Sequence, residues 1–147
     1  MTPTTFTFHH KVDIQIRFND IDMLGHVNNT KLQEYFDLGR MSYLQRIFGP
    51  AMFVDEEAIV IASMKSDFLS PVLLADKLEV LTTIFHLGNK SLKMMQHLRN
   101  VETRMVKTTC ESVMVAVCKS SGQSMLIPEA WKQAIRTFEK SQELFHQ

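Results

Sequence analysis

The sequence predicts an α+β domain in which one long helix packs against one face of an antiparallel sheet. Three observations lead to this fold class. One segment near the N-terminus has strand periodicity, the next has helical periodicity, and three or four long strand-like segments follow. Short loops between the later strands favour antiparallel pairing. The length of 147 residues, without repeats, low-complexity segments or a linker, fits a single domain over residues 1–147.

The first two elements differ in the spacing of their apolar side chains. Residues 10–18 alternate apolar and polar side chains, which predicts a half-buried strand. Residues 30–48 repeat apolar side chains at helical spacing, and Gly49-Pro50 predicts the end of that helix. Gly39 lies in the middle of the predicted helix, where glycine is unfavourable. We therefore expect another element, such as a strand of the sheet, to pack very close to Gly39.

The later segments predict further strands and a final helix. Long apolar runs bounded by turn residues predict strands over residues 58–69, 77–87, 91–99 and 104–119. Helical spacing returns over about residues 128–146, which begin with a proline suited to a first helical turn. The core of the domain is therefore expected within about residues 10–128, with a C-terminal helix following it.

Composition and charge exclude several classes of function. The 16 basic and 16 acidic residues give a formal net charge of zero, and the absence of a basic stripe argues against nucleic acid as a partner. No apolar run approaches the ~20 residues that a membrane-spanning helix needs, so we expect no membrane partner. The N-terminal residues lack the basic and apolar regions of a signal peptide, so we expect a cytoplasmic protein.

The two cysteines, Cys110 and Cys118, fall within one predicted strand. A continuous strand would separate them by roughly 26 Å, whereas a disulfide needs Cα atoms within about 7 Å. We therefore expect two reduced thiols, in keeping with a reducing compartment. A metal site is not expected either, because His9 and His10 point to opposite faces of a strand and no other His/Cys spacing fits zinc.

Residues 17–29, RFNDIDMLGHVNN, form the least ordinary stretch of the chain. They place two aspartates, a glycine, a histidine and two asparagines between a predicted strand and a predicted long helix. Several of these residues suit a helix start: Asn28 or Asn29 can serve as the N-cap, and Thr30 with Gln33 is the alternative, a capping box. The loop thus brings carboxylates close to a helix N-terminus, which carries a partial positive charge and unpaired N–H groups.

This loop resembles the N-terminal signature of hotdog-fold thioesterases of the 4-hydroxybenzoyl-CoA thioesterase type, R-[FY]-x-D-x-D-x-x-G-H-V-N-N. The matching residues are Arg17, Asp20, Asp22, Gly25, His26, Val27, Asn28 and Asn29. Residues 66–80 resemble the family pattern D-F-x-x-P-x-x-x-G-D-x-L-x-V, with Ala75 in place of its glycine, and residues 87–92 resemble L-G-x-K-S-x. The resemblance covers nearly all of residues 10–128.

The resemblance implies a fold, a reaction and an assembly. The fold is the hotdog: a long central helix wrapped by a curved antiparallel sheet, with a C-terminal helix added here. The reaction is hydrolysis of an acyl-CoA to a free carboxylic acid and CoA, without a cofactor. The partners are the acyl-CoA substrate and further copies of the chain, as a homodimer or homotetramer.

Three catalytic roles follow from the resemblance. Asp22 aligns with the acidic residue that acts as nucleophile or general base; the alternative is an Asx-type turn aspartate. The backbone N–H of Asn29 matches the donor to the oxyanion. His26 either orients Asp22, contacts the substrate or packs in the structure. Asp20 is expected to be structural, bonding loop amides or pairing with Arg17.

The remaining candidate residues are substrate-binding. Gly25 allows either a tight turn or close approach of the thioester, and Asn28 belongs to the same loop. Asp67 aligns near a second polar pocket position of the family, or it ends its strand. Lys90 and Ser91 follow a turn that lies near the nucleotide end of CoA in the resembled enzymes, or they are a solvated hairpin.

Two alternative functions differ from acyl-CoA hydrolysis. An acyl-ACP thioesterase would use the same loop, although Leu24 stands where the plant enzymes have a catalytic asparagine. A hotdog module that binds acyl thioesters without hydrolysing them would not need Asp22. The acyl pocket is expected between the long helix and a neighbouring subunit, with walls that include Leu24, Phe36 or Tyr35.

Overall fold

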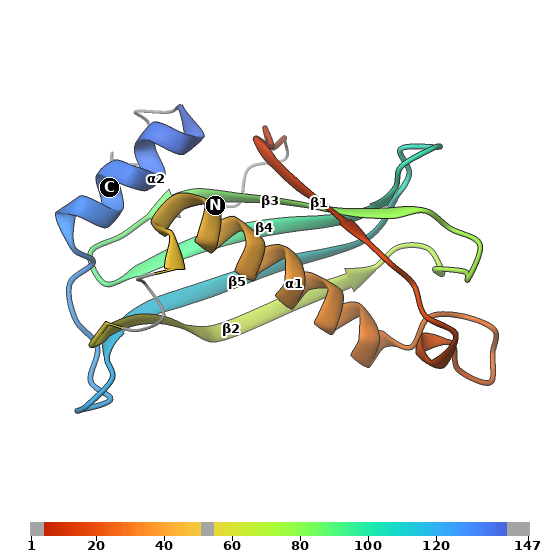
Figure 1. The fold of residues 1–147 in the computed structure, drawn as a ribbon, viewed down its shortest axis with the longest axis horizontal. Helices are drawn as coiled ribbons and strands as arrows, with labels where there is room; N and C mark the ends of the chain where they lie inside the picture. The colour runs from red at the N-terminus through yellow and green to blue at the C-terminus, as the bar shows by residue number, and fades with distance from the viewer. Residues whose placement is uncertain (1–4, 51–54, 141–147) are drawn as a thin grey trace.

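The computed structural model describes residues 5–50 and 55–140. Its elements follow one another as a short strand, a 3-10 turn, a long helix, four strands and a second helix (Figure 1). Their bounds are β1 His10–Ile14, η1 Phe18–Asp20, α1 Asn29–Phe48, β2 Glu57–Phe68, β3 Leu78–Leu87, β4 Ser91–Asn100, β5 Val106–Cys118 and α2 Glu129–Glu139.

The strands form one five-stranded sheet in the order β1-β3-β4-β5-β2, and every neighbouring pair is antiparallel. The four strands after α1 and both helices lie close to where the sequence predicts them. The first strand is shorter than the predicted 10–18, because η1 turns the chain toward the loop and the ladder with β3 ends at Ile14.

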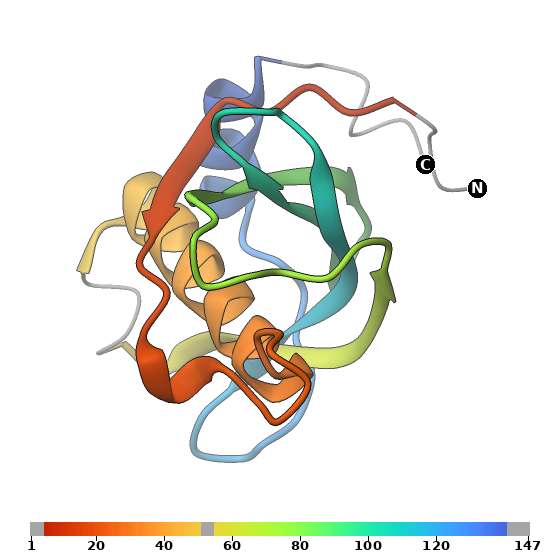
Figure 2. The ribbon, with the colours of Figure 1, turned by 90° about the vertical axis from the view of Figure 1, so that its right-hand side faces the viewer.

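The sheet curves around α1, which lies across its concave face (Figure 2). Gly39 fixes how closely the helix approaches, because a Cβ atom at this position would lie 2.4 Å from Cγ1 of Val80 on β3. The predicted close neighbour of Gly39 is thus β3. Two buried clusters fill the interface, one around Phe36 and Val80 and the other around Tyr43 and Ile135.

The helix α2 completes the second cluster at the end of the sheet farther from the loop of residues 17–29 (Figure 1). Its last residue, Glu139, accepts hydrogen bonds from the hydroxyls of Tyr43 and Thr83 and from the N–H of Ile84. The pairing of β1 with β3 stops at Thr82, so this carboxylate takes over where the ladder ends. Burial raises the pKa of Glu139, although these donors act to lower it.

Two further predictions concern the chain's end and its thiols. Helix α2 ends at Glu139, and the next residue, Lys140, adopts a left-handed conformation with φ 55°. Residues 141–146 of the predicted helix lie outside the described residues. Cys110 and Cys118 are both free thiols, as expected, with Cys110 buried and Cys118 partly buried.

Candidate active site

The loop between η1 and α1 is a compact hairpin. Ile21 and Val27 form an isolated antiparallel bridge, and the N–H of Asp22 donates to the carbonyl of His26 at 2.9 Å. The N–H of Gly25 donates back to the carbonyl of Asp22 at 3.0 Å. Gly25 has φ 81°, a left-handed conformation that glycine adopts without strain. The predicted tight turn at Gly25 is therefore present.

Asp20 anchors this loop to the helix. Its carboxylate accepts a hydrogen bond from the hydroxyl of Tyr35 and another from the N–H of Arg17. Its carbonyl accepts the N–H of Asn28. Burial acts to raise the pKa of Asp20, but the bond from Tyr35, with the Arg17 amide and the nearby charges of Lys31 and Arg17, holds it below the ordinary value. These contacts give Asp20 a structural role.

The helix start is set by Asn28. Its side-chain oxygen accepts the N–H of Thr30 at 2.8 Å, and its carbonyl accepts the N–H groups of Lys31 and Leu32. The asparagine cap thus forms in preference to the capping box of Thr30 and Gln33. Asn29 is the first residue of α1, so its N–H has no carbonyl in the preceding turn of helix to bond.

The carboxylate of Asp22 stabilises the loop through one of its two oxygens. Its Oδ1 accepts the N–H of Leu24 at 2.9 Å and the N–H of His26 at 3.4 Å. This is the Asx-type turn that the sequence offered as the structural alternative for Asp22. Because both bonds go to Oδ1, they leave Oδ2 available to a reactant. The turn and a catalytic role are therefore compatible.

A cavity of about 270 Å³ joins the three predicted catalytic residues. Asp22, His26 and Asn29 border it from the loop and the start of α1. Leu32 of α1 adds an apolar contact, and the other wall comes from Phe68, Leu69, Ser70, Pro71 and Val72, of which only Ser70 is polar. The N–H of Val27 donates to the carbonyl of Val72 at 2.8 Å and holds the two walls together. Asp22 and Asn29, the first residue of α1, thus border one small, largely apolar space.

The predicted substrate-binding residues are spread more widely. Gly25 and Asn28 belong to the loop, next to the cavity. Asp67 is exposed and lies opposite Thr109, on the face of β2 that points away from α1. Lys90 and Ser91 lie at the turn between β3 and β4, at the other end of the sheet from the loop (Figure 1). Within one described chain, Asp67, Lys90 and Ser91 are not brought to Asp22.

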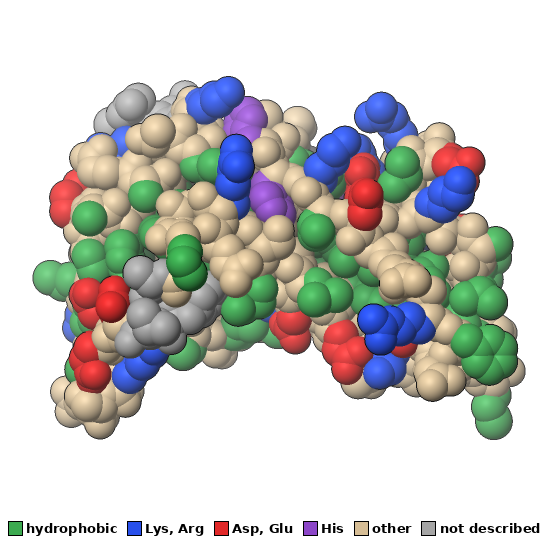
Figure 3. All heavy atoms as spheres, viewed as in Figure 1, with side chains coloured by type: hydrophobic (Ala, Val, Ile, Leu, Met, Phe, Trp, Pro, Cys, Tyr) green, Lys and Arg blue, Asp and Glu red, His purple; other side chains and the backbone are tan. Residues whose placement is uncertain are grey.

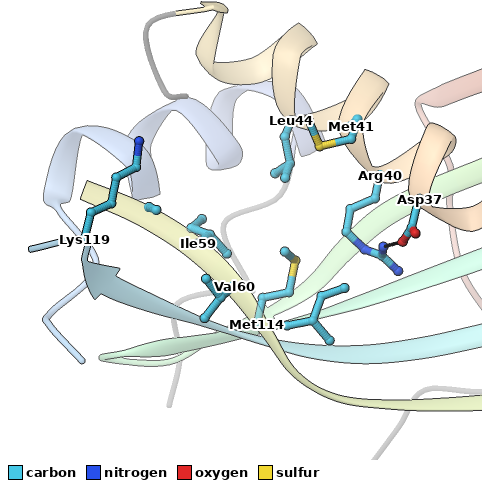
Figure 4. Close-up of a pocket in the computed structure, with 10 residues that line it drawn as sticks. Asp37, Arg40, Met41, Leu44, Ile59, Val60, Met114 and Lys119 are labelled. Carbon is cyan, nitrogen blue, oxygen red and sulfur yellow. Dashed lines mark hydrogen bonds and ion pairs between the residues drawn. The ribbon is translucent and has the colours of Figure 1, made fainter. Parts of the chain in front are cut away.

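A second, larger cavity of about 640 Å³ lies between α1 and β2 (Figure 4). Most of its lining is apolar: Met41, Leu44, Ala58, Ile59, Val60, Ile61 and Met114. Arg40, only 3% exposed, lies at its edge and donates to Asp37 on α1 and to Gln96 on β4. A more polar groove of about 890 Å³ lies on the other side of α1, against β1 and η1.

The residues that the sequence suggested for the acyl-pocket walls belong to a predicted pocket shared with a neighbouring subunit, so they stay a prediction; within one chain, Tyr35 borders the groove beside β1 and η1. Leu24 is mostly exposed, Phe36 is fully buried in the core, and Tyr35 bonds Asp20. None of these three borders the two cavities next to Asp22 and β2 in residues 5–50 and 55–140. Phe68 and Arg40 do border them. The motif over residues 66–80 contained Phe68 and could have indicated it, whereas no local pattern singled out Arg40.

Comparisons with known proteins decide the family. The sequence model of the thioesterase-like superfamily matches residues 16–135. The chain belongs to this superfamily. It is a thioesterase by enzyme class, as the sequence predicts, and solved structures of thioesterases share its fold.

Two individual proteins resemble this chain in sequence over most of their length. The uncharacterized protein YsmA of Bacillus subtilis is 31% identical over 133 residues, which are 90% of this chain and 87% of YsmA. A thioesterase from Thermus thermophilus, crystallised with coenzyme A and Zn, is 32% identical with a TM-score of 0.81. The match covers 91% of this chain and 96% of that structure.

The fold class is confirmed by these structures. The PA5185 protein of Pseudomonas aeruginosa also superposes with a TM-score of 0.81, at 26% identity, over 90% of this chain and 92% of its own. The hotdog arrangement of a long helix on a curved antiparallel sheet is therefore as predicted. The finer resemblance to the 4-hydroxybenzoyl-CoA type stays a prediction.

Two searches of the described residues concern metals and membranes. Among residues 5–50 and 55–140, no three His, Cys, Asp or Glu side chains are grouped so that they could hold a metal ion. In the same residues, no helix has both the length and the apolar character needed to cross a bilayer.

Proposed function

We propose that this protein hydrolyses acyl-CoA thioesters, with Asp22 as nucleophile or general base. One observation carries the proposal: Asp22 and Asn29, the first residue of α1, border the same cavity. A thioester is attacked at its carbonyl carbon, and the charge that develops on the carbonyl oxygen needs donors. The cavity offers a carboxylate for the first task and a helix N-terminus for the second.

Each proposed group has a chemical role that its surroundings support. The free oxygen of Asp22 either attacks the carbonyl carbon or removes a proton from a water that attacks it. In the first case the C–S bond breaks, CoA leaves as the thiolate, and water then hydrolyses the mixed anhydride and restores the Asp22 carboxylate. In the second case the tetrahedral intermediate collapses directly to the free acid and the CoA thiolate, which takes up the proton. The N–H of Asn29 stabilises the oxyanion, and such a donor contributes ~3–4 kcal/mol in the transition state. His26 borders the cavity, and its backbone N–H donates to the Asp22 carboxylate; its imidazole is assigned to contact with the acyl group or to orienting that carboxylate. The products are a free acid and CoA.

The carrier and the cell compartment belong to the proposal as well. Coenzyme A is favoured over an acyl-carrier protein because the Thermus thermophilus thioesterase that binds it is 32% identical to this chain. The two free thiols favour the reducing cytoplasm. Lys90 and Ser91 lie far from Asp22 within one chain, so contacts of theirs with CoA require a second protomer.

Self-association is supported by one edge of the sheet. Strand β2 is an edge strand, and its outer backbone groups have no neighbouring strand in the described chain. Val60, Ile61 and Met64 on this strand are exposed, and so are Leu38 and Met41 on α1. Apolar side chains are visible over α1 and around the loop on the face that Figure 3 shows. We propose that a second copy covers this surface, as a homodimer or within a homotetramer.

A thiol-release assay tests the reaction. Purified protein is given acetyl-, butyryl-, octanoyl-, palmitoyl- and benzoyl-CoA, and an acyl-ACP, with a thiol-reactive dye. Asp22→Asn should lower kcat by about 10²–10⁴-fold. The fold should survive, because an asparagine oxygen can still accept the N–H of Leu24. Asp13→Asn, at an exposed position of β1, is the matched control and should keep the full rate.

Two results would contradict the proposal. A wild-type protein that releases no thiol from any of these substrates is a binding module and not a hydrolase. An Asp22→Asn variant with the wild-type rate leaves the hydrolysis standing and removes Asp22 from it.

A further inference from the structure

The two cavities beside β2 lie at successive positions along α1 and β2. Along α1, Asn29 and Leu32 border the cavity of Asp22, whereas Arg40 and Leu44 border the larger cavity. Along β2 the order is the same: Phe68 borders the first cavity, and the residues from Ala58 to Ile61 border the second. Both elements therefore lead from the proposed catalytic loop toward the larger, apolar space.

One hydrogen bond joins α1 to β2 at a position between the residues that line the two cavities. The side-chain amide of Gln33 on α1 donates to Oγ of Ser66 on β2 at 2.8 Å, and both residues are partly buried. Gln33 follows Leu32 of the first cavity and precedes Arg40 of the second. Ser66 lies between Phe68 and Ile61 and faces the helix. We call this contact the Gln33–Ser66 bridge.

Polar groups near the bridge could form other hydrogen bonds with the Gln33 side chain. The Oε1 atom of Gln33 is buried and has no hydrogen-bond partner in the described residues. The hydroxyls of Thr108 and Ser112 on β5 are also buried without partners there. These two residues lie opposite Phe68 and Met64 in the β2–β5 ladder, so they flank Ser66 on the same face. A displaced Gln33 side chain therefore has polar groups near the bridge that could bond it.

We propose that the Gln33–Ser66 bridge sets the acyl length that the site accepts. The inference rests on the proposed function and deepens it by naming a substrate class. With the bridge formed, as in this structure, an acyl group is confined to the cavity of about 270 Å³ beside Asp22. A longer chain must part the bridge to enter the apolar cavity of about 640 Å³. The favoured substrates are short acyl-CoAs.

The helix supplies a scale for this length. Gln33 lies about 6 Å along the axis of α1 from Asn29, the proposed oxyanion donor. Arg40 lies about 16 Å from Asn29 on the same axis. A butyryl chain fits within the first distance, whereas a palmitoyl chain has to extend past the bridge. A methylene chain cannot replace the hydrogen bond that it breaks, so the polar bridge acts against long apolar groups.

The test compares short and long acyl groups in matched variants. Gln33→Ala removes the bridge and most of the side chain, and Ser66→Ala removes only the acceptor. Glu34→Ala changes the next residue of α1, which is exposed, and serves as the control. The readout is the ratio of kcat/KM for palmitoyl-CoA to that for butyryl-CoA. We expect the ratio to rise at least about tenfold in Gln33→Ala, less in Ser66→Ala, and not in Glu34→Ala.

Binding is measured in parallel, so that the bridge and the hydrolysis are tested separately. Titration calorimetry with the thioethers S-butyl-CoA and S-hexadecyl-CoA, which cannot be hydrolysed, gives the same ratio as affinities. If the wild type hydrolyses butyryl-CoA but neither bridge variant changes the ratio, the bridge does not select length and the thioesterase stands. If the wild type is inert and Gln33→Ala still shifts the affinity ratio, the bridge stands without the hydrolysis. Unchanged affinity ratios in both variants would overturn the inference. Should Gln33→Ala fail to fold, Ser66→Ala decides.

Discussion

The close contact between Gly39 and β3 gives a prediction whose size follows from the structure. A methyl group at Gly39 would lie 2.4 Å from Cγ1 and 3.0 Å from Cβ of Val80, and 3.1 Å from Nε2 of Gln96. Val80 is fully buried, and its branched side chain has little freedom to turn aside. Gly39→Ala therefore forces α1 away from β3 or strains Val80.

Two opposing effects set the magnitude for Gly39→Ala. Alanine is a better helix former than glycine and would stabilise α1 by about 1 kcal/mol. Overpacking of a filled core destabilises by about 1–3 kcal/mol, and a contact as short as 2.4 Å belongs at the upper end. The net effect is a loss of roughly 1–2 kcal/mol in the free energy of unfolding. For a chain of this size, Tm should fall by roughly 2–8 °C.

Urea unfolding of a double-mutant cycle checks the cause. Val80→Ala alone should destabilise, because it leaves a cavity in the core. Combined with Gly39→Ala, it makes room for the new methyl group. The double variant should therefore lose about 0.5–2 kcal/mol less unfolding free energy than the two single variants lose together. If Gly39→Ala is as stable as the wild type, or if the two losses are simply additive, the steric reasoning is wrong.

Two further predictions concern the buried carboxylates. Tyr35→Phe removes a donor to the Asp20 carboxylate and should lower the free energy of unfolding at pH 7 by about 1.5–3 kcal/mol. The folded pKa of Asp20 is depressed, so this difference in stability should persist at pH values above its unfolded pKa of about 3.9. It should shrink as the pH falls through the folded pKa. Urea titrations of both proteins at pH 7 and pH 3 measure the change. The folded pKa of Glu139 is raised, so its contribution is fully present below its unfolded pKa of about 4.3 and is lost as pH rises through the folded value. Thermal unfolding between pH 4 and 8 should therefore show the stability of the wild type relative to Glu139→Gln decreasing as pH rises; parallel profiles would contradict this.

The sequence predicted the residues of the site but not the hydrogen bonds that begin α1. The residues of the loop were identified by their chemistry and order, and the structure brings Asp22, His26 and Asn29 to one cavity. The choice between the asparagine cap and the capping box could not be made in advance, because both satisfy the same N–H groups locally. In the structure Asn28 is the N-cap, and the Gln33 side chain donates to Ser66, 33 positions away in sequence.

The boundaries of the first strand illustrate a second limit. Residues 10–18 keep the alternation of a strand beyond Ile14, yet the ladder with β3 stops there. Periodicity reports which side chains prefer burial, and it does not report whether a neighbouring strand is present to pair. At Ile14 the partner is Leu78, the first residue of β3, so no part of β3 is left for residues 15–18 to pair with.

The sequence alone determined the kinds of element, their order and the chemistry of the loop, because hydrophobic period, turn residues and side-chain types act over a few neighbouring positions. Only the tertiary structure decided which polar groups of α1 meet which strands: Gln33 bonds Ser66 on β2, and Arg40 bonds Gln96 on β4. Those contacts depend on the rotation of the helix on the sheet, which the contact of Gly39 with Val80 fixes, and on the register of β2 against β5. Both are set by the packing of segments far apart in the chain.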